Sequence, residues 1–214
     1  MKAWVLFFIL IAVLASYPFF NKTDNTEKVT GLPWQIETYA DGSTSVFGIK
    51  PGHSRLADAL ETMGDDVELA IVAAGDEAGT LEMYYGHYRA GLLSGKLVLQ
   101  TDSSVQLIKA WRANAVSSEY MPTGQAKKYI PAQDDMPEIL DQTITGLTFI
   151  PAINLDEAVI LSRFGEPAER IRKAEVEHFL YPEKGLDIAL HEKSKEVLQY
   201  VPPERFQRLI QPLR

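Results

Sequence analysis

Hydrophobic and polar positions divide the chain into an apolar start and a longer region of mixed periodicity. Residues 3–20 read AWVLFFILIAVLASYPFF and contain no charged side chain. An unbroken apolar run of about 18 residues lies between the lengths typical of a secretory signal peptide and of a membrane-spanning helix. We therefore expect residues 1–20 to be a signal anchor, or a signal peptide that is cleaved after Ala15.

Of the next two segments, the first is polar and the second has apolar residues at regular spacing. Residues 21–44 begin with NKTDNTEKVT, which has no apolar period, so we expect a tether and entry segment. Residues 45–116 are predicted to form a first α+β unit, with a helix at 55–63 that Gly64 ends and a second helix at 105–115. The predicted strands of this unit are 46–49, 67–74, 81–89 and 96–100.

A second stretch, residues 147–214, repeats this layout. A helix at 155–164 is expected to be capped by Asn154 and ended by Gly165. The predicted strands are 147–150, 176–181, 185–191 and 196–201, and a short helix follows at 204–209. Strand, helix, glycine stop and strand meander thus occur twice in the same order, although the two stretches share few identical residues.

This pattern predicts an α+β fold. We expect an N-terminal transmembrane or signal helix followed by two helix-on-antiparallel-sheet units, related as a degenerate repeat. Residues 117–146 are polar and contain Pro122, Pro131 and Pro137. Long connections of this kind are either linkers or binding loops, and we expect a linker here.

Charge and cysteine content narrow the functional classes. The chain has 29 acidic and 21 basic residues, a net charge of −8. An acidic surface repels phosphate, which argues against a nucleic-acid partner. The chain contains no cysteine, which excludes disulfides, thiolate metal sites, a cysteine nucleophile and a lipidated N-terminal cysteine.

No catalytic or cofactor motif stands out. The histidines are His53, His87, His178 and His191, and none falls in a spacing that places two ligands on one helical face. His178 and His191 could meet across a hairpin near Asp187 and hold a divalent metal, but we expect packed or solvated histidines instead. Ser54 follows His53 just before a helix and is expected to be an N-cap. We therefore predict no catalytic, cofactor-binding or metal-binding residues, and no cofactor.

The run Met83–Arg89 has the most unusual local composition. In a regular strand Tyr84 and Tyr88 would share one face. With Arg89 and Arg112, these tyrosines would suit an exposed protein-binding or glycan-binding surface. The alternative, that the rings are core and cross-strand pairs, stays open.

The segment Leu155–Pro167, LDEAVILSRFGEP, with the meander after it, resembles the small periplasmic modules of bacterial outer-membrane assembly. Those modules share the fold of the β-lactamase inhibitor protein, a helical segment packed on an antiparallel sheet. The resemblance covers residues 147–201 and, more faintly, 45–100. It implies a non-enzymatic, protein-binding module in a Gram-negative envelope. The chain differs from the lipoproteins of that group because it has no cysteine to lipidate.

Together these features predict a non-enzymatic bacterial cell-envelope protein that acts as a protein-interaction module for another envelope protein. We expect it in the inner membrane with a periplasmic soluble region, or in the periplasm if the signal is cleaved. The alternatives are an envelope enzyme that acts on cell-wall glycan through two carboxylates, and a small-ligand-binding periplasmic protein. A cleft with converging polar groups would favour either alternative.

Overall fold

The computed structural model describes residues 29–122 and 124–214, in which strands and helices alternate along the chain. The strands are β1 Glu37–Thr38, β2 Thr44–Ser45, β3 Glu68–Ala74, β4 Thr80–Ala90, β5 Leu93–Thr101, β6 Ser117–Tyr120, β7 Ala126–Ile130, β8 Ile144–Pro151, β9 Glu169–Lys173, β10 Val176–Tyr181, β11 Leu186–His191 and β12 Val197–Tyr200. The helices are α2 Leu56–Met63, α3 Val105–Ala113, α4 Met136–Leu140, α5 Glu157–Phe164 and α6 Phe206–Ile210. The 3-10 turns are η1 Gln133–Asp135, η2 Pro182–Lys184, η3 Pro203–Arg205 and η4 Gln211–Leu213.

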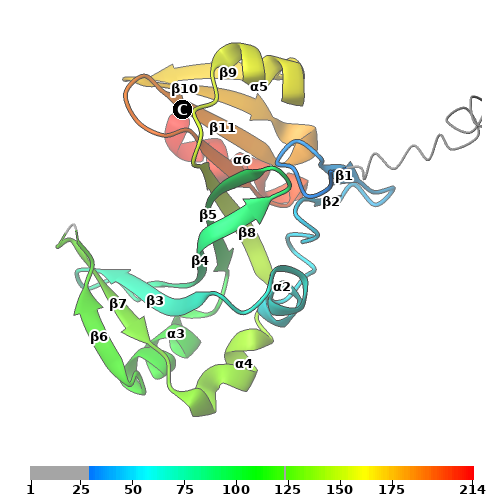
Figure 1. Cartoon of the computed structure of the whole chain (residues 1–214). Helices are drawn as coiled ribbons and strands as arrows, with labels where there is room; N and C mark the ends of the chain where they lie inside the picture. The colour runs from blue at the N-terminus through cyan, green and yellow to red at the C-terminus, as the bar shows by residue number, and fades with distance from the viewer. Residues whose placement is uncertain (1–28, 123) are drawn as a thin grey trace, which may run out of the picture.

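Ten of these strands form one antiparallel sheet in the order β6-β7-β3-β4-β5-β8-β12-β11-β10-β9 (Figure 1). Strands β1 and β2 form a separate pair. The predicted α+β class is confirmed for the described residues. Strand β8 pairs with β5 on one side and with β12 on the other, so the two predicted units share one sheet.

One face of this sheet carries the main core. Side chains that alternate along the central strands, such as Met83, Leu97, Phe149 and Ile188, are fully buried on this face. Helices α2, α3, α4 and α5 contribute buried residues to the same cluster. On the other face, α6 covers only β10 and its surroundings, where Leu180 packs with buried side chains of α6.

The two predicted helix stops are confirmed, but the predicted N-cap of α5 is wrong. Gly64 and Gly165 follow α2 and α5 with positive φ angles of 91° and 84°, which favour glycine. Helix α5 is capped by Asp156, whose side chain accepts a hydrogen bond from the backbone N–H of Val159 at 2.8 Å. The expected cap Asn154 lies outside the helix start.

The same order of elements occurs twice, and one contact recurs with it. The order is helix, then three antiparallel strands: α2-β3-β4-β5 and α5-β9-β10-β11. The Tyr85 hydroxyl on β4 donates to the carbonyl of Gly64 at 3.1 Å. The Tyr181 hydroxyl on β10 donates to the carbonyl of Gly165 at 2.8 Å. Each helix end is therefore fixed to the middle strand by a tyrosine.

Two expectations are corrected here. The predicted strand 46–49 is a tight turn, in which Phe47 has a φ of 56° and packs its ring 5.4 Å from that of Phe149. Residues 117–146, expected to be a linker, contain β6, β7, η1 and α4. Strand β7 pairs with β3 and extends the sheet, and Ile139 of α4 is buried in the main core.

Within residues 29–122 and 124–214, no helix is long and apolar enough to cross a membrane. The predicted signal anchor or signal peptide at 1–20 lies outside the described residues, as does the tether up to residue 28.

Candidate functional site

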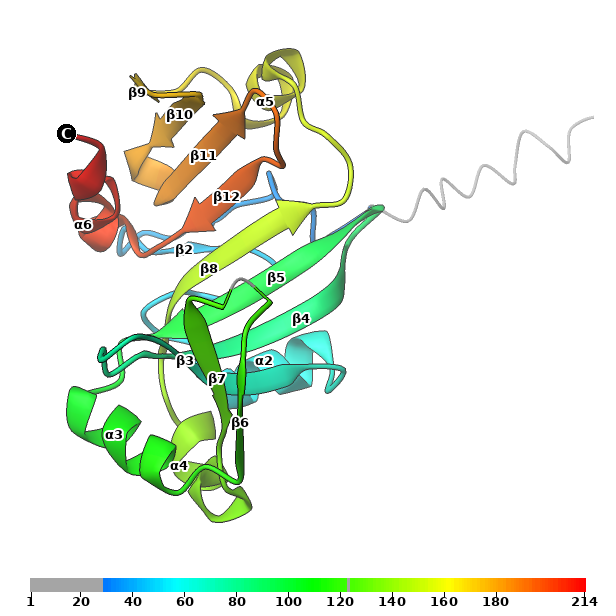
Figure 2. The ribbon, with the colours of Figure 1, turned by 90° about the vertical axis from the view of Figure 1, so that its left-hand side faces the viewer.

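A hollow of about 460 Å³ lies between strands β3–β5 and the β6–β7 hairpin. It is on the sheet face opposite α2, because Tyr84 lines it whereas its neighbours Met83 and Tyr85 are buried in the main core. Figures 1 and 2 show that β6 and β7 curl away from the plane of β4, β5 and β8. The hairpin therefore forms one wall of the hollow.

The floor of the hollow comes from side chains that lie next to one another across the sheet. Tyr84 pairs with Glu68 on β3 and with Val98 on β5, so these three form a row. The apolar lining residues are Ala70, Val72, Val98, Met121 and Pro122. The tyrosine ring and these aliphatic groups make the floor a surface suited to apolar side chains.

Five charged residues line the hollow, and three of them, Lys128, Glu68 and Glu119, pair with one another. The ammonium group of Lys128 contacts the carboxylate of Glu68 and lies 2.8 Å from that of Glu119. Hydrogen bonding to Lys128 lowers the pKa of Glu119, and the two carboxylates raise the pKa of Lys128. A glycosidase acid needs a raised carboxyl pKa, so Glu119 suits an ion pair better than general acid catalysis.

Strand β6 forms an edge of the sheet beside this hollow. All four of its residues, SSEY, are exposed, and Val116 before it is 69 % exposed. Edge strands present unpaired backbone groups and are usually protected by charge or proline. The opposite edge, β9, has the sequence ERIRK and is protected in this way. Glu119 is the one charged residue of β6, which leaves this edge less protected.

The predicted surface residues do not lie together. A register shift between Tyr85 and Tyr88 turns Tyr88 to the core face, where its ring is 5.5 Å from that of Phe47 and 6.4 Å from that of Phe149. Burial raises the pKa of Tyr88 to about 12. The expectation that Tyr84 and Tyr88 share a face is therefore wrong, because the bulge changes the alternation of the strand.

Neither arginine joins Tyr84. Arg89 is exposed near the end of β4. Arg112 donates to the carbonyls of Glu77 and Ala78 at 2.6 and 2.8 Å, and its guanidinium lies 4.5 Å from the centre of the Tyr129 ring. Arg112 thus fixes the β3–β4 turn. Of the four predicted residues, Tyr84 alone lines the hollow.

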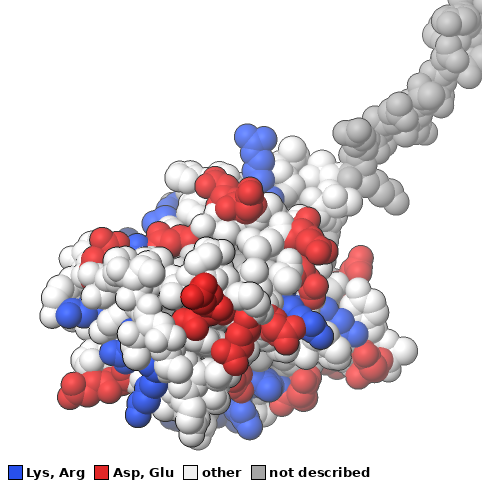
Figure 3. Space-filling view, turned by 90° about the horizontal axis from the view of Figure 1, so that it is seen from below, with Lys and Arg blue, Asp and Glu red and all other residues white. Residues whose placement is uncertain are grey.

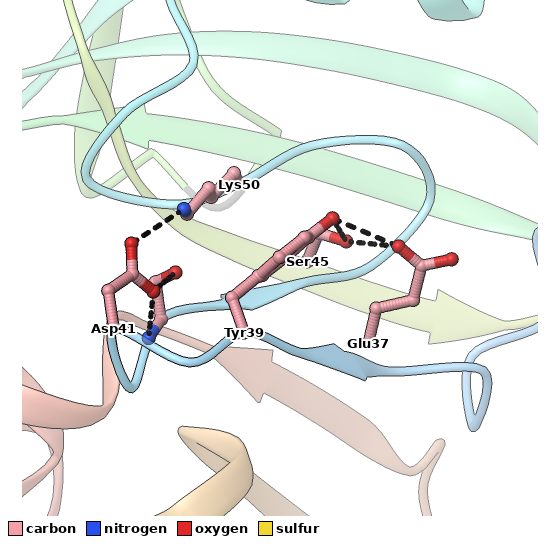
Figure 4. Close-up of polar contacts among 6 residues, drawn as sticks. Glu37, Tyr39, Asp41, Ser45 and Lys50 are labelled. Carbon is pink, nitrogen blue, oxygen red and sulfur yellow. Dashed lines mark hydrogen bonds and ion pairs between the residues drawn. The ribbon is translucent and has the colours of Figure 1, made fainter.

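A second polar cluster holds the β1–β2 hairpin (Figure 4). The Tyr39 hydroxyl donates to Glu37 at 2.9 Å and lies 3.2 Å from the Ser45 hydroxyl. Hydrogen bonds from Ser43, and then Lys50 at 3.1 Å, lower the pKa of Asp41. These groups satisfy one another across the turn, which gives the cluster a structural role.

The histidine and serine candidates also have structural roles. His178 Nδ1 lies 2.9 Å from the buried carboxylate of Asp187. His178 is opposite Ala189, so it does not face His191 across the hairpin. Ser54 accepts a hydrogen bond from the backbone N–H of Lys50 instead of capping α2. In the part of the chain that the structure describes, no group of three or more His, Cys, Asp or Glu side chains could hold a metal ion.

Sequence reasoning missed the hairpin wall of this site. The sequence signal for it was weak, because β6 and β7 read SSEY and AKKYI and lack a strong apolar alternation. Comparison with known proteins adds no relative: no family model matches the chain, and neither a curated protein nor a solved structure does.

Proposed function

We propose that this chain is a non-enzymatic protein of a bacterial cell envelope that binds another envelope protein. Residues 1–20 would anchor it in the inner membrane with the described residues in the periplasm, or would be removed on export. The observation that carries the proposal is the apolar hollow beside the exposed edge strand β6. An exposed edge next to a groove is a recurring mode of recognition of extended peptide segments.

The partner would supply an extended segment. Its backbone would add to the free edge of β6, and alternate side chains would enter the hollow over Tyr84 and Val98. Backbone hydrogen bonds supply affinity in this mode, and the pockets for side chains supply specificity. Apolar side chains of the partner suit the floor, because the charged groups Lys128, Glu68 and Glu119 are already paired at the rim.

A small apolar ligand is the second candidate. The volume of about 460 Å³ falls in the range of ligand pockets, roughly 300–1,000 Å³. An enzyme that acts on cell-wall glycan has less support, because it needs a carboxyl group held protonated next to a second carboxylate. At the rim, Lys128 instead pairs with both Glu68 and Glu119.

The division of the fold into two related helix-on-sheet units is part of the same proposal. The recurring order of elements and the shared tyrosine contacts with Gly64 and Gly165 support a degenerate repeat of two helix-on-sheet units. The resemblance of residues 147–201 to the periplasmic modules of outer-membrane assembly is part of the same proposal. Such modules bind proteins, as the proposed function requires.

Crosslinking in intact cells tests the proposal. The full-length chain would be isolated after crosslinking, and co-purified envelope proteins would be quantified by mass spectrometry. We expect one dominant partner, which Tyr84→Ala reduces at least about tenfold because the floor of the hollow loses its tyrosine ring. Tyr39→Ala is the matched control, since Tyr39 is an exposed tyrosine just after β1 and outside the hollow.

The binding mode has its own measurement. Hydrogen exchange of the complex should show new protection of residues 117–120, because strand addition engages the free amides of β6. Equal loss of the partner with Tyr84→Ala and Tyr39→Ala would contradict the hollow as the site. A hollow that binds small apolar probes, with no protein enriched, would favour the second candidate.

A further inference from the structure

One end of the sheet gathers exposed apolar side chains. Leu92, in the turn between β4 and β5, is 82 % exposed, and Ile153, in the loop after β8, is 49 % exposed. The backbone N–H of Ala152 donates to the carbonyl of Ser94 at 2.8 Å, so the two loops lie side by side. We call residues 91–94 and 152–154 the tip; it is the end of the β4–β5 hairpin in Figure 2.

The described chain begins at this tip. A Cβ placed on Gly91 would lie 2.8 Å from Cγ1 of Val29 and 2.9 Å from Cδ2 of Leu32, so residues 29–32 pack on the hairpin turn. The apolar residues 3–20 therefore connect to the rest of the molecule here. Residue 29 is nine residues after residue 20, so the two lie at most about 32 Å apart when the chain is extended. If residues 3–20 lie in a membrane, the tip is held within that distance of it.

The charge of the tip differs from that of the whole chain. Residues 86–98 contain His87, Arg89 and Lys96 and no acidic residue, and residues 144–155 contain no charged residue. The ammonium group of Lys195 lies 2.6 Å from the carbonyl of Ala152. Basic groups thus flank the exposed leucine, whereas on the side of Ile153 the hollow that Asn154 and Lys195 line also contains Asp156, Glu192 and Glu196.

A group of four acidic residues lies at the other end of β8. This strand runs from α4 to the tip and is about 26 Å long, given its eight residues. The segment around α4 carries Asp134, Asp135, Glu138 and Asp141. Figure 3 views this end and shows acidic side chains near the middle of the face. An anionic surface would attract the tip and repel this end.

We propose that the tip faces the membrane, with Leu92 and Ile153 in the headgroup region of an anionic bilayer and Arg89 and Lys96 near its phosphates. This rests on the proposed anchoring by residues 1–20. Exposed aliphatic side chains with flanking basic groups bind such interfaces by burial of apolar area and by charge attraction. The anchor brings the tip close enough for two side chains to be sufficient.

Because the chain has no native cysteine, one introduced cysteine can be labelled at a single defined position. Leu92→Cys, Ile153→Cys and Asp134→Cys would each carry one environment-sensitive fluorophore on the full-length, uncleaved chain. The protein would be reconstituted in vesicles of phosphatidylcholine and phosphatidylglycerol in a three-to-one ratio. Spin-labelled lipid should quench positions 92 and 153 at least about threefold more than position 134, with a blue-shifted emission at the first two.

The outcomes separate the two proposals. Protein that floats with the vesicles but shows equal quenching at positions 92 and 134 would overturn the tip inference and leave the anchor standing. If the protein does not float with the vesicles, both the proposed anchor and the tip inference are wrong. Partner binding is tested separately by crosslinking. Adding Arg89→Glu to the Leu92→Cys variant should lower quenching at position 92, and unchanged quenching would overturn the role of charge.

Discussion

At the scale of single residues, the most informative groups are tyrosines whose hydroxyls are held away from water. Burial raises the pKa of Tyr85, Tyr88 and Tyr181 to about 12, and that of Tyr200 above its usual value. Two of these hydroxyls hold the ends of helices, as described above. Their charged forms are disfavoured in the folded protein, which links its stability to alkaline pH.

The direction of this link follows from the two states. Below pH 10 the tyrosines are protonated in both states, so they leave the free energy of unfolding unchanged. Between about pH 10 and 12 the unfolded chain loses these protons while the folded chain keeps them, so stability falls by about 1.4 kcal/mol per pH unit for each tyrosine. We expect the urea midpoint to fall over this range.

Tyr88→Phe provides the matched control for this prediction. The variant keeps the ring among Phe47 and Phe149 but has no phenol to ionise, so its midpoint should fall less steeply than that of the wild type. Lysines titrate in the same range in both proteins and cancel in the comparison. Identical slopes would show that Tyr88 ionises equally in the folded and unfolded states.

At the scale of elements, the structure shows which sequence patterns were sufficient to predict a strand. Apolar patterns predicted β4, β5, β10 and β11 within three residues of their bounds. Strands β4 and β5 have one face in the core, and β10 and β11 are partly buried on both faces. Strand β9, with the sequence ERIRK, was missed, because four of its five residues are charged and it is stabilised by pairing with β10. Residues 169–173 form a strand because they pair with β10, and the local sequence pattern does not contain this pairing.

The candidate site was predictable only in part for a related reason. Tyr84 was found from the composition of its run, and it does line the hollow. Tyr88 was misplaced, because a bulge adds one residue to one strand and reverses the alternation after it. No local residue signals this bulge strongly, although Gly86 lies within it. The hairpin wall needed the long-range pairing of β7 with β3.

Because of the bulge, we expect alanine substitution of two tyrosines in the same strand to change the stability of the protein by different amounts. Tyr88→Ala should destabilise the protein by about 3 kcal/mol, because it removes a ring packed among aromatic core residues. Tyr84→Ala should cost less than about 1 kcal/mol, because its ring lines an open hollow. Urea unfolding followed by far-UV circular dichroism measures both. Equal losses of stability would mean that both rings are core residues, and Tyr84 would then no longer serve as a probe of binding.

At the scale of the whole molecule, the arrangement of strands determines how the two halves behave together. The sequence predicted separate units at 45–116 and 147–214. In the structure β8 pairs with seven residues of β5 and three of β12, and one buried cluster extends from Ile71 in β3 to Ile188 in β11. Units that share a strand and a core lose contacts together, so we expect one cooperative unfolding transition.

Two tryptophans allow each half to be followed separately. Trp111 is buried on α3 in the first half, and Trp34 packs edge-on against Phe164 of α5 in the second, with ring centres 6.1 Å apart. In a Trp4→Phe background, Trp34→Phe leaves the first reporter and Trp111→Phe the second. Within each variant, the fluorescence midpoint in urea should equal the midpoint from far-UV circular dichroism, because a shared sheet unfolds as a unit. A fluorescence midpoint that departs from the far-UV midpoint in either variant would mean that the halves are independently stable. Strand β8 would then be a hinge between two domains and not the centre of one sheet.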